Sequence, residues 1–324
     1  MINTINHIPA QISIDKLNKY EKNEEIIQQL SHLEIPFLDE PIMELENNDT
    51  FICESDLVLF STSNNLEESF LQFHIYDKEH DDFIINHDIF LFSSINDSEY
   101  IYKNNKHYIA LATCEKDIML YDSLVFNPLT PQLLLKGHDD SVLAVKFFNN
   151  ALYSGSDDKK ILEWDLETLR IKESFTTNLN VEKIANAGNM IFYGEKNTIA
   201  NLSTGTNFFI DGNLENMVGH ENFLYLTTSS GSFYTYDSRN TCKPFFEHKY
   251  SEEPLTGLHF LNDKIGMCSK KGEIWVLDSK DFEIKNTENI KSTLFSIKLH
   301  ESNVIFYGDE GDSLQMKKMR NVIF

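Results

Sequence analysis

The segment 137–175 constrains the fold more than any other part of this chain. It reads GHDDSVLAVKFFNNALYSGSDDKKILEWDLETLRIKESF, so it opens on Gly137-His138 and reaches Trp164-Asp165 after two runs of alternating apolar and polar residues. Such alternation is typical of strands that bury one face. A single unit of this kind cannot bury its apolar residues alone, so the chain is expected to contain further copies that pack against it.

The same unit recurs in degraded copies, each made of a strand, a short polar turn and a second strand. The seven units span residues 57–77, 109–122, 151–165, 190–203, 223–237, 264–278 and 304–318. Their second strands end at Asp77, Asp122, Asp165, Ser203, Asp237, Asp278 and Lys317, which are 34 to 45 residues apart. This period, and the GH and WD dipeptides of the clear copy, resemble the WD40 repeat, in which each repeat forms one four-stranded blade. We therefore expect an all-β chain that folds as a seven-bladed WD40 β-propeller.

Residues 1–48 do not carry the unit and are predicted to form an N-terminal extension, with the propeller over residues 49–324. One helical face of the segment 22–33 collects the apolar residues Ile26, Ile27, Leu30 and Leu33. This pattern predicts a short amphipathic helix, followed by an acidic linker. Because so short a helix is marginal alone, it is expected to dock either on its own propeller or on a partner.

Closure of the ring has two expected contributors. The tail 317–324 is basic and then apolar, so it is predicted to supply a closing strand of the seventh blade. A strand from residues 35–50 is the other candidate, for completing another blade. The sequence leaves the choice between closure schemes open.

Four residues of the clear repeat invite a functional interpretation: His138, Ser154, Asp158 and Trp164. A His, a Ser and an Asp would suit a hydrolase triad, but the chain has no G-x-S-x-G nucleophile motif. The resemblance to WD40 blades implies instead that the four form a structural hydrogen-bond network. We predict no catalytic residue, no cofactor and no small-molecule substrate, so the chain is not expected to be an enzyme.

Composition narrows the function further. The net charge of −23 disfavours a protein that coats nucleic acid with its whole surface. The cysteines Cys53, Cys114, Cys242 and Cys268 form no CxxC or Cys/His cluster, so we expect no metal site and a reducing compartment. No segment approaches the ~20 apolar residues of a membrane span, and the N-terminus does not resemble a secretory signal.

Several short motifs, in order along the chain, resemble the periodic tryptophan protein 1 family. They include the opening MINTINHIPA, the stretch 74–91, the repeat IALATCEKDIMLYDS before GHDDSVLAV, and the segment 221–240. The resemblance implies a nucleolar WD40 scaffold of ribosome biogenesis and rRNA processing, without cofactors. Its implied partners are ribosomal proteins and assembly factors of the large (60S) subunit precursor, and the chain would be a monomer within that particle. Only Trp164 and Trp275 remain as tryptophans, and the long acidic insertion and basic linkers associated with the family are trimmed.

Two sets of residues are candidates for partner binding. Turns between the two strands of a unit carry Lys116, Lys159, Lys160, Lys196, Lys270 and Lys271. These lysines are expected to form a local basic rim that meets pre-rRNA or an acidic partner, unless they are ordinary solvated turn residues. Arg239, in the sequence YDSR, resembles the WDxR box of substrate receptors of cullin–RING ubiquitin ligases. That role, and a generic scaffold in chromatin or trafficking, are the alternative functions.

Overall fold

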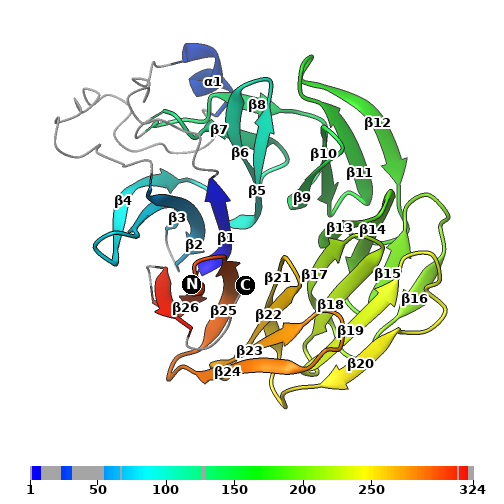
Figure 1. Cartoon of the computed structure of the whole chain (residues 1–324). Helices are drawn as coiled ribbons and strands as arrows, with labels where there is room; N and C mark the ends of the chain where they lie inside the picture. The colour runs from blue at the N-terminus through cyan, green and yellow to red at the C-terminus, as the bar shows by residue number, and fades with distance from the viewer. Residues whose placement is uncertain are drawn as a thin grey trace.

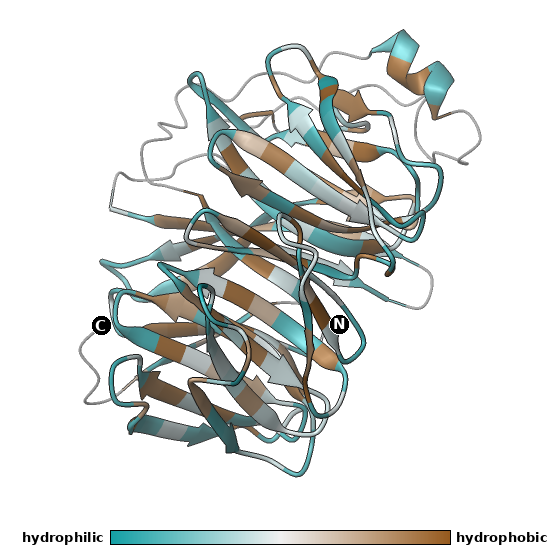
Figure 2. Ribbon diagram, turned by 90° about the vertical axis from the view of Figure 1, so that its right-hand side faces the viewer, coloured by the Kyte–Doolittle hydropathy of each residue, from teal (hydrophilic) through white to brown (hydrophobic). Residues whose placement is uncertain are grey.

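The computed structural model describes residues 2–8, 23–30, 55–65, 68–125, 128–311 and 314–319. Seven antiparallel sheets are arranged in a ring, each forming one blade (Figure 1). The chain is therefore the seven-bladed β-propeller that the repeats predict. In each blade the strands pair in chain order, and the first strand lies innermost. Figure 2 shows hydrophobic residues along the strands and hydrophilic residues at the turns.

Blades 1 to 4 come first in the chain. Blade 1 contains β1 (Ile2–Ile8), β2 (Leu57–Asn64), β3 (Ser69–Asp77) and β4 (Asp82–Leu91). Blade 2 contains β5 (Ile95–Lys103), β6 (Lys106–Thr113), β7 (Ile118–Asp122) and β8 (Leu133–Leu135). Blade 3 contains β9 (Val142–Phe148), β10 (Ala151–Ser156), β11 (Lys160–Asp165) and β12 (Arg170–Thr176). Blade 4 contains β13 (Lys183–Ala187), β14 (Met190–Glu195), β15 (Thr198–Asn201) and β16 (Asn207–Phe209).

Blades 5 to 7 complete the ring. Blade 5 contains β17 (Leu214–His220), β18 (Phe223–Thr228), β19 (Ser232–Asp237) and β20 (Phe246–Lys249). Blade 6 contains β21 (Leu255–Leu261), β22 (Lys264–Ser269), β23 (Glu273–Asp278) and β24 (Ile284–Asn289). Blade 7 has three strands within the described residues, β25 (Leu294–His300), β26 (Val304–Asp309) and β27 (Gln315–Lys318). Each predicted unit coincides with the second and third strands of one blade.

Asparagine pairs make the tight hairpins between the first and second strands of two blades. Asn104 and Asn105 have φ of 54° and 60°, and Asn149 and Asn150 have φ of 49° and 61°. Two consecutive residues with positive φ are the requirement of a type I′ turn, whose twist matches that of the flanking strands. Asparagine tolerates this conformation better than other non-glycine residues, so the Asn-Asn dipeptides specify where these strands reverse.

The ring closes through the N-terminus, which differs from the prediction. β1 pairs with β2 as the innermost strand of blade 1, and it lies between β25 of blade 7 and β5 of blade 2. The Ser296 hydroxyl donates a hydrogen bond of 3.1 Å to the carbonyl oxygen of Ile2, and Ile2 packs in one apolar cluster with Phe306. The predicted boundary, with residues 1–48 as an extension, is thus wrong for β1, because seven residues are too few to carry the two-strand unit that revealed the other blades. The predicted closing segment 35–50 lies outside the described residues. Of the predicted tail 317–324, residues 317 and 318 belong to β27 of blade 7, and residues 320–324 lie outside the described part.

The predicted helix is present as α1 (Glu24–Gln29). The Asn23 side chain caps it by accepting hydrogen bonds from the backbone N–H groups of Glu25 and Ile26. Ile26 and Leu30 are buried in a cluster that also contains residues of blades 1 and 2, beside which α1 lies in Figure 1. The helix was expected to dock either on its own propeller or on a partner, and α1 docks on its own propeller. Leu33 lies outside the described residues.

One close approach between blades gives a sharp test of the packing. An added Cβ at Gly219 of β17 would lie 1.6 Å from the backbone oxygen of Asn186 in β13. We expect Gly219→Ala to lower the free energy of unfolding by about 3 kcal/mol, because two backbones would have to separate. The matched control is Gly205→Ala, where the space is open and only the positive φ of 66° is strained. That control should cost about 1 kcal/mol in urea unfolding, and equal losses in both variants would contradict the close approach.

Candidate partner-binding surfaces

Blade 3 brings the four residues of the predicted network together. His138 Nδ1 lies 3.0 Å from Asp158 Oδ2, and His138 Nε2 lies 2.8 Å from Ser154 Oγ. The Trp164 indole N–H donates to the same Ser154 oxygen at 2.8 Å. Asp158 also accepts the backbone N–H of Lys160 and so holds the turn that joins β10 to β11.

The donor and the acceptor of each hydrogen bond in this network are determined by its two end groups, the Asp158 carboxylate and the Trp164 indole N–H. The Asp158 carboxylate only accepts, so His138 donates through Nδ1–H and its Nε2 is the acceptor. Ser154 must then donate its hydroxyl proton to Nε2, which leaves its oxygen free to accept from Trp164. Burial lowers the pKa of His138, which keeps the imidazole in this neutral form. Each polar atom of the relay therefore has a partner.

A hydrolase triad has the same Asp–His–Ser order, but here the three side chains are enclosed in the blade. Ser154 is 0% exposed, and His138 and Trp164 are 4% and 1% exposed. A nucleophile must reach its substrate, and the Ser154 oxygen is enclosed and already accepts the indole N–H. The network holds the turn against the core of blade 3.

The six predicted lysines lie on one rim of the propeller, spread over blades 2, 3, 4 and 6. We call the rim formed by the turns between second and third strands the lysine rim. Each such turn meets the start of the next blade's innermost strand, as where Ser141 donates to the backbone oxygen of Cys114. Lys116, Lys159 and Lys270 are exposed and form no ion pair with a described residue.

Acidic neighbours interrupt the basic character of this rim. Lys160 pairs with Asp139 at 2.5 Å. Lys196 lies 3.6 Å from Glu195, and Lys271 lies at the same distance from Glu273. Three of the six lysines expected to form a local basic rim are thus paired, because the same rim also carries carboxylates. Three separated lysines remain free to meet an anionic partner.

Arg239 lies on the opposite rim, in the loop after β19. Its guanidinium binds the Asp237 carboxylate through two hydrogen bonds, of 2.8 and 2.6 Å. This contact lowers the pKa of Asp237 to about 2. Arg239 is therefore held in place by its own blade while its side chain stays 62% exposed.

A groove of about 800 Å³ runs between blades 4 and 5 beside Arg239. Its wall includes Phe208 of β16 and Tyr236 of β19, whose rings lie 4.4 Å apart and join the two blades. Arg239 and Lys243 line the groove and no described acidic residue does, on a protein of net charge −23. The Arg239 charge is balanced by Asp237, so Lys243 supplies the net positive charge of a groove that is otherwise aromatic and polar.

One exposed phenylalanine lines this groove, and a second follows one of its lining residues. Phe209 of β16 lines the groove and is 65% exposed. Phe245 follows the lining residue Pro244 and is 64% exposed, and its ring lies beside Phe223 of blade 5 and Phe282 of blade 6. Large aromatic side chains left in water beside a groove are a mark of partner-binding surfaces. Sequence reasoning selected Arg239 but missed the phenylalanines. The doublets Phe208-Phe209 and Phe245-Phe246 were the available signal, since only one residue of such a doublet in a strand can face the core.

Metal-binding clusters and membrane-spanning helices are not seen within the described part of the chain. No group of three or more His, Cys, Asp or Glu side chains in these ranges could hold a metal ion. Among the same residues, no helix is long and apolar enough to cross a membrane. A propeller with this architecture is typical of non-catalytic scaffolds.

Comparisons with known proteins agree with this architecture. No family model matches the chain. Human WD repeat-containing protein 43 is 38% identical over 71 residues, which are 21% of this chain and 10% of that protein, so the match spans a small part of the relative's length. The crystal structure of the computationally designed Ika8 protein superposes with a TM-score of 0.59 over 79% of this chain and 82% of its own, at 14% identity, which shows likeness of fold. The GH–WD repeat, the seven-bladed ring and the partial sequence match together fit a WD40-repeat protein.

Proposed function

We propose that this chain is a non-catalytic WD40 scaffold that holds partner proteins through the groove between blades 4 and 5. The exposure of Phe209 in the wall of that groove, with exposed Phe245 next to its lining residue Pro244, carries the proposal. Leaving two phenylalanine rings in water costs free energy that a partner would recover by covering them. Aromatic residues set beside a concave surface are the usual anchors of protein interfaces.

The charge of the groove indicates the partner's chemistry. The two charged residues that line it, Arg239 and Lys243, are both cationic, while the whole protein is strongly acidic. An acidic segment that carries an apolar or aromatic residue complements this surface, because its carboxylates would meet the cations while its apolar residue packs on the phenylalanines. The Arg239 guanidinium is already oriented by Asp237, so it loses little freedom when a partner binds.

For the process served, we propose assembly of the large ribosomal subunit in the nucleolus. The resemblance of the N-terminal opening and of the blade order to the periodic tryptophan protein 1 family supports this proposal. In this setting the chain would act as a monomer within a larger particle, with assembly factors and ribosomal proteins as partners. Any pre-rRNA contact is assigned to Lys116, Lys159 and Lys270, the lysines of the rim that form no ion pair with a described residue.

The test is a tagged pull-down of the full chain compared with the double variant Phe209→Ser/Phe245→Ser. We expect the variant to lose about tenfold or more of its groove partner, since truncating interface anchors costs roughly 2 kcal/mol or more. The matched control is Ile84→Ser/Ile85→Ser, because these two side chains are 49% and 48% exposed on β4, far from the groove in Figure 1. Circular dichroism and the Tm verify that each variant is folded. Equal recovery of the partner by both double variants would overturn the groove assignment.

Mass spectrometry and northern analysis of the same pull-down test the process. Large-subunit ribosomal proteins together with unprocessed rRNA are the expected result. Recovery of a cullin–RING adaptor, or of chromatin proteins without pre-rRNA, would contradict the role in ribosome assembly. The role of the groove in protein binding would then be decided by the comparison of the two double variants.

A further inference from the structure

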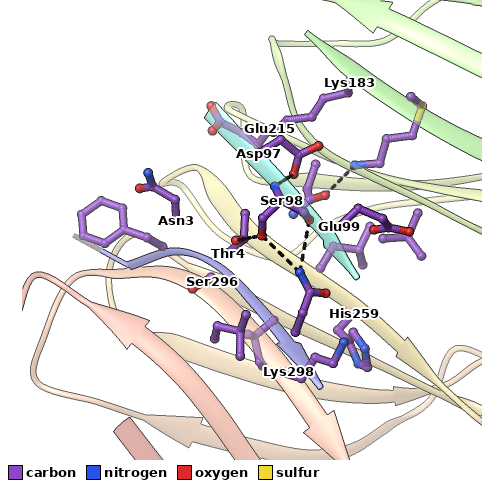
Figure 3. Close-up of a pocket in the computed structure, with 18 of the residues that line it drawn as sticks. Asn3, Thr4, Asp97, Ser98, Glu99, Lys183, Glu215, His259, Ser296 and Lys298 are labelled. Atoms are coloured by element: carbon purple, nitrogen blue, oxygen red, sulfur yellow. Dashed lines mark hydrogen bonds between the residues drawn. The ribbon is translucent and has the colours of Figure 1, made fainter. Parts of the chain in front are cut away.

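The central channel of the propeller is a polar cavity with a volume of about 540 Å³. The innermost strands of all seven blades line it, namely β1, β5, β9, β13, β17, β21 and β25. Its lining carries ionisable side chains of both signs, shown in Figure 3. Ionised groups in such an enclosed space cost solvation energy unless they are paired, so each of them needs a partner.

Strand register sorts these side chains into two layers. Asp97, Lys183 and Glu215 stand at the third, first and second positions of their strands, near the lysine rim. The fifth positions of five strands form a deeper layer, which contains Asn6, Glu99, Lys146, His259 and Lys298. In Figure 3 Lys183, Glu215 and Asp97 lie toward one end of the cavity, and His259 and Lys298 lie toward the other.

The deeper layer contains two lysines and a single carboxylate, that of Glu99. Lys146 pairs with Glu99 at 3.0 Å, and this carboxylate raises the pKa of Lys146. Lys298 has neither an ion pair nor a hydrogen bond with any described residue. Burial lowers the pKa of Lys298 to about 8, with Glu99 opposing this shift and Lys146 adding to it, so its ammonium is still charged at pH 7. The layer therefore carries an excess of one cation.

His259 adds a neutral donor to this cation. The backbone N–H of Leu299 donates to His259 Nδ1 at 3.2 Å, so this nitrogen carries no proton. Burial holds the pKa of His259 well below its ordinary value, so the ring is neutral and its proton sits on Nε2. Asn6, by contrast, is engaged, because its amide donates to the backbone oxygen and the hydroxyl of Ser98.

We propose that the deeper layer of the channel is a binding site for one compact oxyanion, held by the Lys298 ammonium and the Nε2–H of His259. An anion there would add a second counter-charge for the two lysines that share Glu99, and it would accept from both donors. Asp97 and Glu215, in the layer near the lysine rim, disfavour ligands with many negative charges, because their carboxylates would repel a polyanion that filled the whole channel. The site therefore suits a single phosphate or carboxylate group. This proposal is independent of the groove between blades 4 and 5.

Calorimetric titration of the full chain with inorganic phosphate at pH 7 tests the site. We expect saturable binding to one site, weakened about tenfold or more by Lys298→Met, because a charge-assisted contact is lost. Lys298→Arg keeps the charge and should retain most of the binding. Lys106→Met, at an exposed lysine that begins β6, is the matched control and should bind like the original chain. A parallel titration with acetate distinguishes the sources: comparable affinity indicates a carboxylate ligand, and much weaker binding indicates a phosphate.

Three outcomes would overturn the proposal. One is the absence of saturable binding of either anion at millimolar concentration. Another is an unchanged affinity in the folded Lys298→Met variant, which would place the anion elsewhere. The third is tighter binding of inositol hexakisphosphate than of phosphate with no dependence on Lys298, since the channel's carboxylates should exclude such a polyanion.

Discussion

Ser154→Ala is expected to lower the free energy of unfolding by about 2 to 5 kcal/mol, although it removes a single oxygen atom. That oxygen accepts from the Trp164 indole and belongs to the hydroxyl that meets His138 Nε2, with both contacts at 2.8 Å. Its loss leaves a buried donor and a buried acceptor unpaired, and each such group costs roughly 1–3 kcal/mol. The measurement is equilibrium urea unfolding, with Ser174→Ala on the exposed face of β12 as the control, expected within about 0.5 kcal/mol of the original chain.

A double-mutant cycle separates this network from ordinary packing. Trp164→Phe removes the indole N–H and leaves the Ser154–His138 contact in place. If the relay acts as a unit, the loss in Ser154→Ala/Trp164→Phe should be smaller than the sum of the two single losses, by about 0.5 kcal/mol or more. Strict additivity, or a loss below about 1 kcal/mol in Ser154→Ala alone, would show that the relay contributes little.

Acidification from pH 7 to pH 5 is expected to destabilise the protein by about 2 kcal/mol for each of three histidines of blade 1. Burial lowers the pKa of His7, His74 and His87 from 6.5 to about 4 in the folded chain. Between these pKa values the unfolded chain binds protons that the folded chain does not, so stability falls as the pH falls. At pH 5 the solution is about 1.5 pH units below the unfolded pKa of 6.5 and still above the folded pKa. At about 1.4 kcal/mol per unit, this corresponds to about 2 kcal/mol per histidine.

The check is the free energy of unfolding measured in urea at several pH values between 7 and 5. His74→Gln should flatten the pH dependence by close to one proton, because His74 is 0% exposed and titrates only on unfolding. Carboxylates with lowered pKa, such as Asp237, titrate below this window and do not mimic the effect. Equal stability at pH 7 and pH 5 would contradict the assignment. Since all three histidines lie in β1, β3 and β4, blade 1 should open first in acid.

The sequence alone determined the repeating part of this protein. Strand alternation, polar turns and the 34-to-45-residue period are local properties, so the order of residues along the chain was enough to place all seven two-strand units. The partners within blade 3 followed from the resemblance to WD40 blades, and in the structure the turn brings Asp158 back toward His138 and Ser154. α1 was predicted by its apolar face, but the sequence could not decide what that face contacts.

Only the tertiary structure decided how the ends and the surfaces are used. β1 joins blade 1 because closing the ring brings Ile2 beside blade 7, a contact between residues almost a full chain apart. The lysine rim differs from its prediction because its charge depends on carboxylates from neighbouring turns and blades. The groove and the channel layers are likewise formed by residues from different blades. Local pattern specifies a blade, whereas sites between blades depend on contacts that no local pattern records.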